Sequence, residues 1–156
     1  MAAKIARQAQ VPVVLDPVSV PREFPVDLFD VNLICPNESE AAALVGGPVD
    51  SIEDGEAAAR ELQNRGCRQV AITLGDQGVV LADQFGNVNH LSAISIKAVD
   101  TTAAGDTFAG ALAVEWATSC ALIDAVRFAN CVGAIAASRD GAQPGMGTRK
   151  EIEALL

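Results

Sequence analysis

The sequence predicts an α/β fold in which helices flank a mainly parallel sheet, a Rossmann-like three-layer arrangement. Short β-branched runs alternate with alanine-rich helical segments along the chain. Several helical segments begin at a capping residue and end at glycine, and 50% of the residues are hydrophobic, enough for a sizeable core. The 156 residues fit a single α/β domain, residues 1–156.

The first third of the chain predicts two strands and then two helices. "VPVVLD" (11–16) and "VNLIC" (31–35) are β-branched runs that each end at proline. "NESEAAALVGG" (37–47) predicts a helix that begins at an asparagine cap and ends at Gly-Gly. "SIEDGEAAARELQNRG" (51–66) repeats this pattern, with a serine cap and a final glycine.

A β-rich region is predicted next, followed by helices. "QVAITLG" (69–75) and "GVVLAD" (78–83) are joined by a tight turn, and strand-like sequence with a hairpin turn at Gly86-Asn87 continues to Asp100. Two long helices are then expected, from 105 to about 119 and from 123 to about 138. A loop rich in glycine and proline follows the second of them and leads to a short C-terminal helix at 149–156.

Composition excludes several classes of function. The net charge of −9 and only three lysines argue against a nucleic-acid surface, which needs clustered basic residues. No window approaches the roughly 18 uncharged apolar residues of a membrane span, and the first ten residues lack a signal peptide's apolar stretch, so we expect a cytoplasmic protein. The four cysteines are expected to be buried free thiols: Cys35, Cys67, Cys120 and Cys131.

The stretch "TTAAGDTFAG" (101–110) places Ala103, Ala104 and Gly105 before Asp106 at the start of a predicted helix. Such small residues let a ligand reach the unpaired N–H groups of the first helical turn, which form an anion site. A carboxylate there is unfavourable for phosphate unless it faces a hydroxyl, so the pattern suggests a base that orients an alcohol toward a phosphoryl group. A plain helix cap formed by Asp106 and Thr107 is an equally weighted alternative.

Three segments together resemble the ribokinase-like carbohydrate kinases. "VDTTAAGDTFAGALA" (99–113) is similar to the family's C-terminal signature, and "PNESEAAALVG" (36–46) to its Asn-x-x-Glu segment. "FANCVGAIAASRDGAQPGMGTRKEI" (128–152) resembles its tail. The similarity covers essentially the whole chain but corresponds to only the C-terminal half of such a kinase, without the N-terminal half and its sugar-covering lid.

The resemblance implies a role for each matching residue. Asp106 would be the catalytic base and sugar contact, with the anion hole at Ala103, Ala104 and Gly105. Asn37 and Glu40 would act on the magnesium and phosphate side, although they could form only a capping box. The nucleotide-binding positions would be Asn37, Thr73, Leu74, Gly75, Asp76, Gln77, Gly78, Gly105 and Asn130. A hairpin turn alone could explain "TLGDQG" (73–78), and Asn130 could simply be a polar residue satisfied by its neighbours.

The family also uses a monovalent cation such as K⁺, held partly by backbone carbonyls. The matching positions are Asp100, Thr102, Ala136, Arg139, Gly141 and Gly145. Gly145 stands where the family often has serine, which removes one possible side-chain ligand.

The resemblance therefore implies an ATP-dependent sugar kinase (a transferase) that uses Mg²⁺ and K⁺, with ribose as the best single acceptor. The alternative is a catalytically incompetent nucleotide-binding or interaction module of the same fold; a third possibility is a kinase for a nucleoside or another alcohol. If residues 11–16 form a normally interior strand, its edge is left unpaired. We therefore expect a homo-oligomer, aggregation, or dependence on the remaining half.

Overall fold

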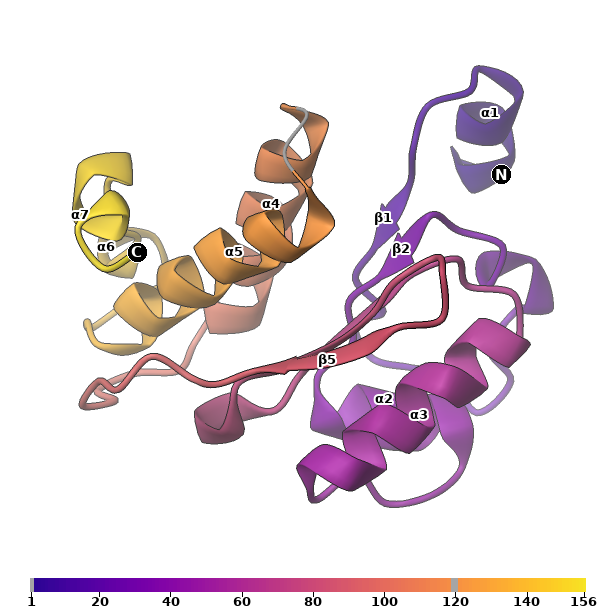
Figure 1. The fold of residues 1–156 in the computed structure, drawn as a ribbon, viewed down its shortest axis with the longest axis horizontal. Coiled ribbons are helices and arrows are strands. Elements are labelled where there is room, and N and C mark those ends of the chain that lie inside the picture. The colour runs from indigo at the N-terminus through magenta and orange to yellow at the C-terminus, as the bar shows by residue number, and fades with distance from the viewer. Residues whose placement is uncertain (1, 119–120) are drawn as a thin grey trace. The chain divides into compact units, whose positions relative to one another are not determined.

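The computed structural model describes residues 2–118 and 121–156 and divides into two compact units, residues 1–90 and 91–156. The single domain predicted for residues 1–156 is not tested by this division and stays a prediction. Each unit is described below by itself (Figure 1).

The first unit is built on a five-stranded sheet with the strand order β1-β2-β3-β4-β5. β1 runs parallel to β2 and β2 parallel to β3, whereas β3 and β4 form an antiparallel hairpin. The predicted mainly parallel α/β fold is therefore confirmed. The strands are β1 (Val14–Leu15), β2 (Leu33–Ile34), β3 (Val70–Thr73), β4 (Val79–Ala82) and β5 (Val88–Leu91).

Two helices of the first unit, α2 (Glu38–Val45) and α3 (Ile52–Asn64), pack against this sheet and begin where the sequence predicted them. They are capped by Asn37 and Ser51, as predicted. The two helices lie side by side in Figure 1 and pack a shared apolar core onto the strands. The remaining elements of the unit are α1 (Ala2–Gln8), η1 (Val26–Leu28) and η2 (Gly75–Gln77).

One glycine allows α3 to approach the sheet closely. A Cβ on Gly55 would lie 3.1 Å from Leu74 Cδ1 and 3.3 Å from Val80 Cγ2. Leu74 and Val80 are both fully buried in the core, so they have little room to move away. Gly55 therefore sets the distance between the helix and the strands.

The second unit is helical. α4 (Ala104–Ala117) and α5 (Leu122–Ala137) lie against each other, and the short helices α6 (Ala142–Gly145) and α7 (Arg149–Glu153) follow (Figure 1). An apolar cluster joins α5 to α7 through Phe128, Val132, Ile135 and Ile152. The second unit thus presents the start of α4 and the glycine-rich loop before α7 on one helical scaffold.

Several predicted boundaries were wrong. The strand expected at 11–16 is only Val14–Leu15, because Pro12 and Pro17 lack an N–H and the Val13 N–H is donated to the Asn32 side chain at 2.9 Å. The strand-like sequence predicted up to Asp100 forms no strand in the described residues from 92 to 100: the N–H groups of Val99 and Asp100 bond instead to the Ala137 carbonyl, at 2.8 and 3.2 Å, at the end of α5.

Some helical segments were also misjudged. α1 and α6 were not predicted. The N-cap of α6 is Gly141, which has no side chain that could cap a helix. The last helix ends at Glu153 and not at Leu156. The helix predicted to end at Ser119 ends at Ala117, and Ser119 itself lies outside the described residues.

Candidate functional site

In the first unit, two predicted motifs lie next to each other at the carboxyl ends of β2 and β3. The Thr73 N–H donates to the Pro36 carbonyl at 3.0 Å, and Asn37 pairs with Thr73 in a parallel bridge. The segments 36–40 and 73–78 therefore start from adjacent strand ends. In open α/β sheets this is where ligands bind.

Asn37 and Glu40 form a reciprocal capping box at the start of α2. The Asn37 Oδ1 accepts the Glu40 N–H at 2.9 Å and the Ser39 hydroxyl at 2.8 Å. In return, Glu40 Oε2 accepts the Asn37 N–H at 2.9 Å. The capping alternative is thus observed. It leaves Glu40 Oε1 and the Asn37 amide nitrogen without a role in the cap.

The segment 73–78 forms the predicted tight turn. The Leu74 N–H donates to the Gly78 carbonyl at 2.7 Å, and the Gly78 N–H donates to the Gly75 carbonyl at 3.3 Å. Gly75 and Gly78 have φ angles of +52° and +100°, which favour glycine. The side chain of Gln77 reaches away from the turn and donates to the Asp50 carbonyl at 3.3 Å.

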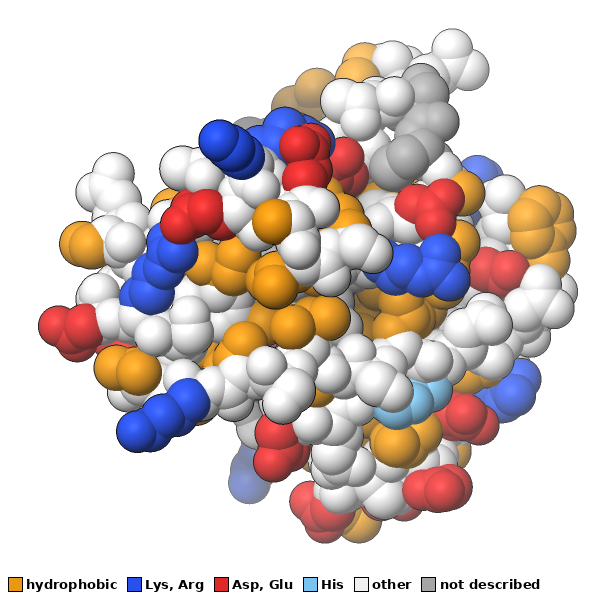
Figure 2. Space-filling view, turned by 60° about the vertical axis from the view of Figure 1, so that its left-hand side comes forward, with side chains coloured by type: hydrophobic (Ala, Val, Ile, Leu, Met, Phe, Trp, Pro, Cys, Tyr) orange, Lys and Arg blue, Asp and Glu red, His pale blue; other side chains and the backbone are white. Residues whose placement is uncertain are grey.

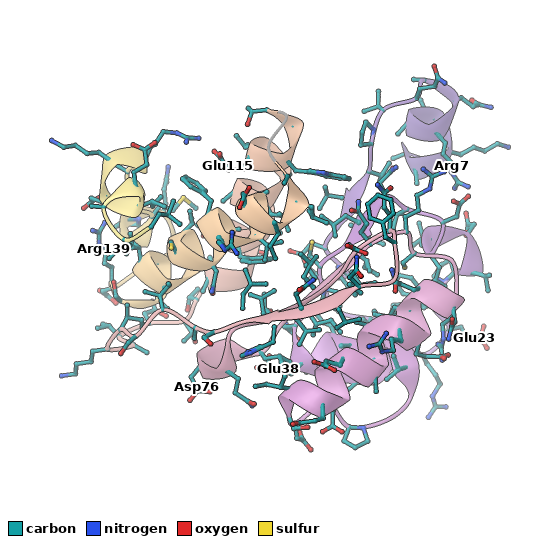
Figure 3. All side chains as sticks on the ribbon, viewed as in Figure 1. Arg7, Glu23, Glu38, Asp76, Glu115 and Arg139 are labelled. Atoms are coloured by element: carbon teal, nitrogen blue, oxygen red, sulfur yellow. The ribbon has the colours of Figure 1, made fainter. Side chains whose placement is uncertain are left out.

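Sequence reasoning missed Glu38, which borders this turn. A Cβ on Gly75 would lie 3.1 Å from Glu38 Oε1, so the carboxylate rests against the open face of the glycine. Figure 3 labels Glu38, at the start of α2, and Asp76, in η2. The only sequence feature that could have pointed to Glu38 is its place beside Asn37 in "NESE". Nothing in the sequence shows that the start of α2 faces the turn at 73–78.

In the second unit, α4 begins without any capping side chain. Its N-cap is Ala103, in the left-handed conformation with φ +60°. The Thr107 hydroxyl donates to the Ala103 carbonyl at 2.6 Å, and so it does not serve the N–H groups of the first turn. The alternative in which Asp106 and Thr107 cap the helix is therefore wrong.

The start of α4 is open to solvent. Gly105 and Asp106 are exposed, and a Cβ on Gly105 would meet no atom within 4 Å. Among the described residues, no hydrogen bond or ion pair involves the Asp106 carboxylate. The Ala104 N–H donates to the Thr101 carbonyl at 3.2 Å, so the N–H groups of Gly105 and Asp106 and this carboxylate are the groups presented to a ligand. This arrangement suits an anion beside an alcohol.

The positions expected around a monovalent cation come together in the second unit. The Asp100 carboxylate accepts the N–H of Thr102 at 2.9 Å and that of Gly141 at 3.0 Å. Hydrogen bonds from the side chain and N–H of Thr102, and then from the Gly141 N–H, lower the pKa of Asp100. Asp100 therefore joins the loop before α4 to the loop before α6.

Backbone carbonyls converge on Gly145 in the same region. A Cβ there would lie 3.2 Å from the Ala136 oxygen and 3.7 Å from the Arg139 oxygen. The Gly141 carbonyl is occupied by the Gly145 N–H at 2.9 Å. Carbonyl and carboxylate oxygens are suitable ligands for K⁺, and glycine at position 145 places no side chain against the two carbonyls. The Ala136 carbonyl also accepts the Arg139 N–H at 3.3 Å.

The described residues offer fewer ligands for Mg²⁺ than for K⁺. No group of three or more His, Cys, Asp or Glu side chains gathers anywhere in the described parts of the chain. Mg²⁺ can nevertheless be held by one carboxylate, water and the phosphates of a nucleotide. Glu40 Oε1 could supply that carboxylate oxygen.

The side chain of Asn130 is hydrogen-bonded to a neighbouring segment, as the structural alternative predicts. Its Nδ2 donates to the Ser92 carbonyl at 2.9 Å, which fixes the irregular segment after β5 against α5. The side-chain oxygen of Asn130 is not used in that bond. A nucleotide contact through this oxygen remains a proposal.

Other predictions concern the surface and the thiols. In the face drawn in Figure 2, Lys and Arg side chains are interspersed with Asp and Glu. Cys35, Cys67 and Cys131 are buried and free, and burial raises the pKa of each, that of Cys67 to about 12. Cys120 lies outside the described residues.

Of the helices described, none is both long and apolar enough to cross a membrane.

Comparison with known proteins places the chain in a family. The sequence pattern of the pfkB family carbohydrate kinases matches residues 1–149. Ribokinase from Haemophilus influenzae is 35% identical over 153 residues, which cover 97% of this chain and 49% of that protein. Ribokinase from Arabidopsis thaliana is 34% identical over 156 residues, covering 99% of this chain and 41% of that protein.

Solved structures of ribokinases are also similar to this chain. The structure of Arabidopsis thaliana ribokinase complexed with ribose and ATP superimposes with a TM-score of 0.89 at 34% identity, over 98% of this chain and 50% of that one. Ribokinase from Thermotoga maritima gives a TM-score of 0.87 at 33% identity, over 99% of this chain and 52% of that one. The chain thus spans about half the length of the relatives it matches. It belongs to the pfkB family carbohydrate kinases.

Proposed function

We propose that this chain carries the phosphate, metal and nucleotide side of an ATP-dependent sugar kinase. Ribose is the leading acceptor, because the relatives at about 35% identity are ribokinases and one of them was solved with ribose and ATP. The product would then be ribose 5-phosphate. The observation that carries the proposal is the open start of α4, where unpaired N–H groups adjoin the exposed Asp106 carboxylate.

Asp106 would accept the proton of the attacking hydroxyl and hold that oxygen in line with the γ-phosphate. The N–H groups of Ala103, Gly105 and Asp106 would stabilise the negative charge on the transferred phosphoryl group, and that of Ala104 could join them only by leaving the Thr101 carbonyl. In the first unit, the turn at 73–78 is the proposed nucleotide contact; in the second unit, Asn130 is proposed as a nucleotide contact by itself. Mg²⁺ would neutralise phosphate charge beside Glu40, and K⁺ beside the Ala136 and Arg139 carbonyls would stabilise the loop that precedes α4.

The test is ADP release by the purified chain with ATP, Mg²⁺ and K⁺, measured with and without ribose. We expect ribose-dependent release that falls by about 10²- to 10⁴-fold in Asp106→Asn, the usual worth of a general base. Asp27→Asn is the matched control, since Asp27 is an exposed carboxylate with no proposed role. Release that does not depend on ribose, or that is unchanged in Asp106→Asn, would contradict the proposal.

The second candidate is a nucleotide-binding module without catalysis. The observation that favours it is the formed turn at 73–78, in which the Leu74 N–H donates to the Gly78 carbonyl at 2.7 Å. Detectable ATP binding with no ADP release under any of the conditions above would support this candidate.

We also propose that the chain associates with another polypeptide, either a second copy or the remaining half of a kinase. β1 lies at an edge of the sheet, where its outer side is available for pairing. It is, however, only two residues long and is flanked by Pro12 and Pro17, which limits uncontrolled pairing. A stable, well-dispersed monomer in size-exclusion chromatography would contradict association.

A further inference from the structure

The only histidine of the chain, His90, contacts the turn at 73–78. It lies in β5, and its Nε2 is 2.6 Å from the Gln77 carbonyl oxygen. Gln77 is the last residue of η2 and lies 13 residues earlier in the chain. The contact therefore joins β5, at the end of the strand order, to the turn between β3 and β4.

The acceptor determines which ring nitrogen of His90 carries a hydrogen. A backbone carbonyl oxygen can only accept a hydrogen bond, so Nε2 must donate. A neutral ring with its hydrogen on Nδ1 would instead place two lone pairs 2.6 Å apart. His90 is therefore held with its hydrogen on Nε2, and it donates to the turn whether the ring is neutral or charged.

Gln77 is held from a second direction through its side chain. Its Nε2 donates to the Asp50 carbonyl at 3.3 Å, in the segment before α3. Its own N–H donates to the Leu74 carbonyl at 2.8 Å, within the turn. Contacts from β5, from the segment before α3 and from the turn itself thus meet at one residue.

The turn needs such contacts because its glycines give it conformational freedom. Gly75 and Gly78 have φ angles of +52° and +100°, and glycine loses more backbone entropy on ordering than any other residue. Gly75, Asp76 and Gln77 are all exposed, so core packing does not fix them. Beyond the turn's own hydrogen bonds, the contact with His90 and that with Asp50 therefore set the path of its exposed part.

We propose that His90 is a positioning residue for nucleotide binding. Its Nε2–H holds the Gln77 carbonyl, and the turn at 73–78 is thereby kept in the conformation that a nucleotide meets. The inference rests on the proposed function, in which this turn contacts the nucleotide, and it adds a residue outside the turn. It gives His90 no part in the proton transfer assigned to Asp106.

The experiment measures ATP binding to the ¹⁵N-labelled 156-residue chain by NMR titration in the presence of Mg²⁺. His90→Leu removes the donor, and we expect the dissociation constant of ATP to rise about three- to tenfold, the usual worth of one hydrogen bond. His90→Gln keeps an N–H donor on the side chain and should recover most of the affinity. This recovery separates the hydrogen bond from packing of the ring.

Asn89→Leu is the matched control. Asn89 is the exposed neighbour of His90 in β5, and successive residues of a strand point to opposite faces of the sheet. The control adds the same side chain to the same strand and should leave the dissociation constant of ATP unchanged. His90 is only partly buried, so none of these replacements opens the core, and circular dichroism verifies that each variant is folded.

Amide hydrogen exchange tests the turn without any ligand. The N–H groups of Gln77 and Gly78 donate to the Leu74 and Gly75 carbonyls within the turn. Their exchange should become about three- to tenfold faster in His90→Leu and return toward the original rate in His90→Gln. Unchanged exchange in His90→Leu would overturn the inference, because the turn would then keep its conformation without His90.

ADP release separates this inference from the proposed function. An ATP affinity that is unchanged in His90→Leu, or lowered equally in His90→Leu and His90→Gln, would overturn the inference even if ribose supports ADP release. ATP binding that depends on the His90 donor, without ribose-dependent ADP release, would uphold the inference and overturn the kinase function. No ATP binding by the unmodified chain would overturn both.

Discussion

The two units begin their functional helices in opposite ways. In the first unit, the start of α2 is closed by its own side chains, since Asn37 and Glu40 each accept an N–H of the other residue. In the second unit, α4 starts at Ala103 with no capping side chain and with left-handed backbone. Both starts belong to segments that resemble kinase motifs.

The difference separates structural stability from ligand binding. A side chain that caps a helix satisfies N–H groups that a ligand could otherwise use. At α2, any ligand must therefore contact the side-chain atoms that the cap leaves unused. At α4, the backbone itself is available, and the fold gives up the stability of a cap to keep it so.

The largest expected effect is a loss of stability when the sheet that carries the segments 36–40 and 73–78 is weakened. Ile72 in β3 is fully buried, one residue before Thr73. Ile72→Ala should lower the free energy of unfolding by about 2–5 kcal/mol, because it leaves a cavity in the core. Urea denaturation followed by circular dichroism measures this. Val26→Ala, at a residue 78% exposed, should change it by less than about 0.5 kcal/mol.

The same titration tests the single-domain prediction. Trp116 is the only tryptophan, and it lies in α4 of the second unit. If residues 1–156 form one cooperative domain, the tryptophan fluorescence transition should shift together with the circular dichroism transition in Ile72→Ala. A fluorescence transition that stays in place would show that the units unfold separately.

A smaller effect sharpens the contrast between the helix starts. Asn37→Ala should destabilise the protein by about 1 kcal/mol, since the Glu40 N–H loses its acceptor. Ala103→Gly should cause no loss and could gain up to about 1 kcal/mol, because glycine adopts the positive φ without strain. Thermal unfolding of both variants measures the difference. Equal losses would show that the start of α4 depends on the Ala103 side chain.

Weak anion binding should distinguish the two starts as well. In an NMR titration with inorganic phosphate, we expect the amide signals of Gly105 and Asp106 to shift, and that of Glu40 to stay, because its N–H is already donated to Asn37. Asp106→Asn should tighten phosphate binding several-fold by removing a like charge. Equal shifts at both helices would remove the distinction.

The smallest effect is a pH dependence in the second unit. Hydrogen bonds from Arg139 and then from Thr148 lower the pKa of Glu151 from 4.5 to about 2. A lowered folded-state pKa adds stability above the unfolded pKa, and this stability is lost as the pH falls from 4.5 toward 2. Because the pair is exposed, the effect is small.

Melting temperatures of the protein and of Glu151→Gln measure this dependence. The variant should melt lower at about pH 6, and the difference should vanish near pH 2. Glu23→Gln, at an exposed carboxylate of the first unit labelled in Figure 3, is the control and should show no such trend. A difference that persists at low pH would assign the effect to lost packing and not to charge.

Local chemistry was enough to predict many elements. Asn37 and Ser51 are strong capping residues, and Gly75 and Gly78 permit a turn that other residues resist. These preferences act within a few residues of the chain, so they can be recognised without the rest of the fold. The same holds for the small residues before Asp106, which predicted an open helix start.

The errors fall where distant contacts decide. The strand expected at 11–16 is shortened because Asn32 takes the N–H of Val13. The strand expected before Asp100 is missing because the end of α5 accepts the N–H groups of Val99 and Asp100. In each case a backbone group bonds to a partner that is remote in sequence, and local propensity carries no information about that partner.

By itself, the sequence determined the fold class, the family and the residue types available for phosphoryl transfer, because caps, turns and motif spacing are local properties. Only the tertiary structure decided that Thr73 lies beside Asn37, that carbonyls of Ala136 and Arg139 converge on Gly145, and that His90 bonds to the Gln77 carbonyl. These juxtapositions depend on side-chain packing between elements far apart in the chain, which burial of the whole core selects.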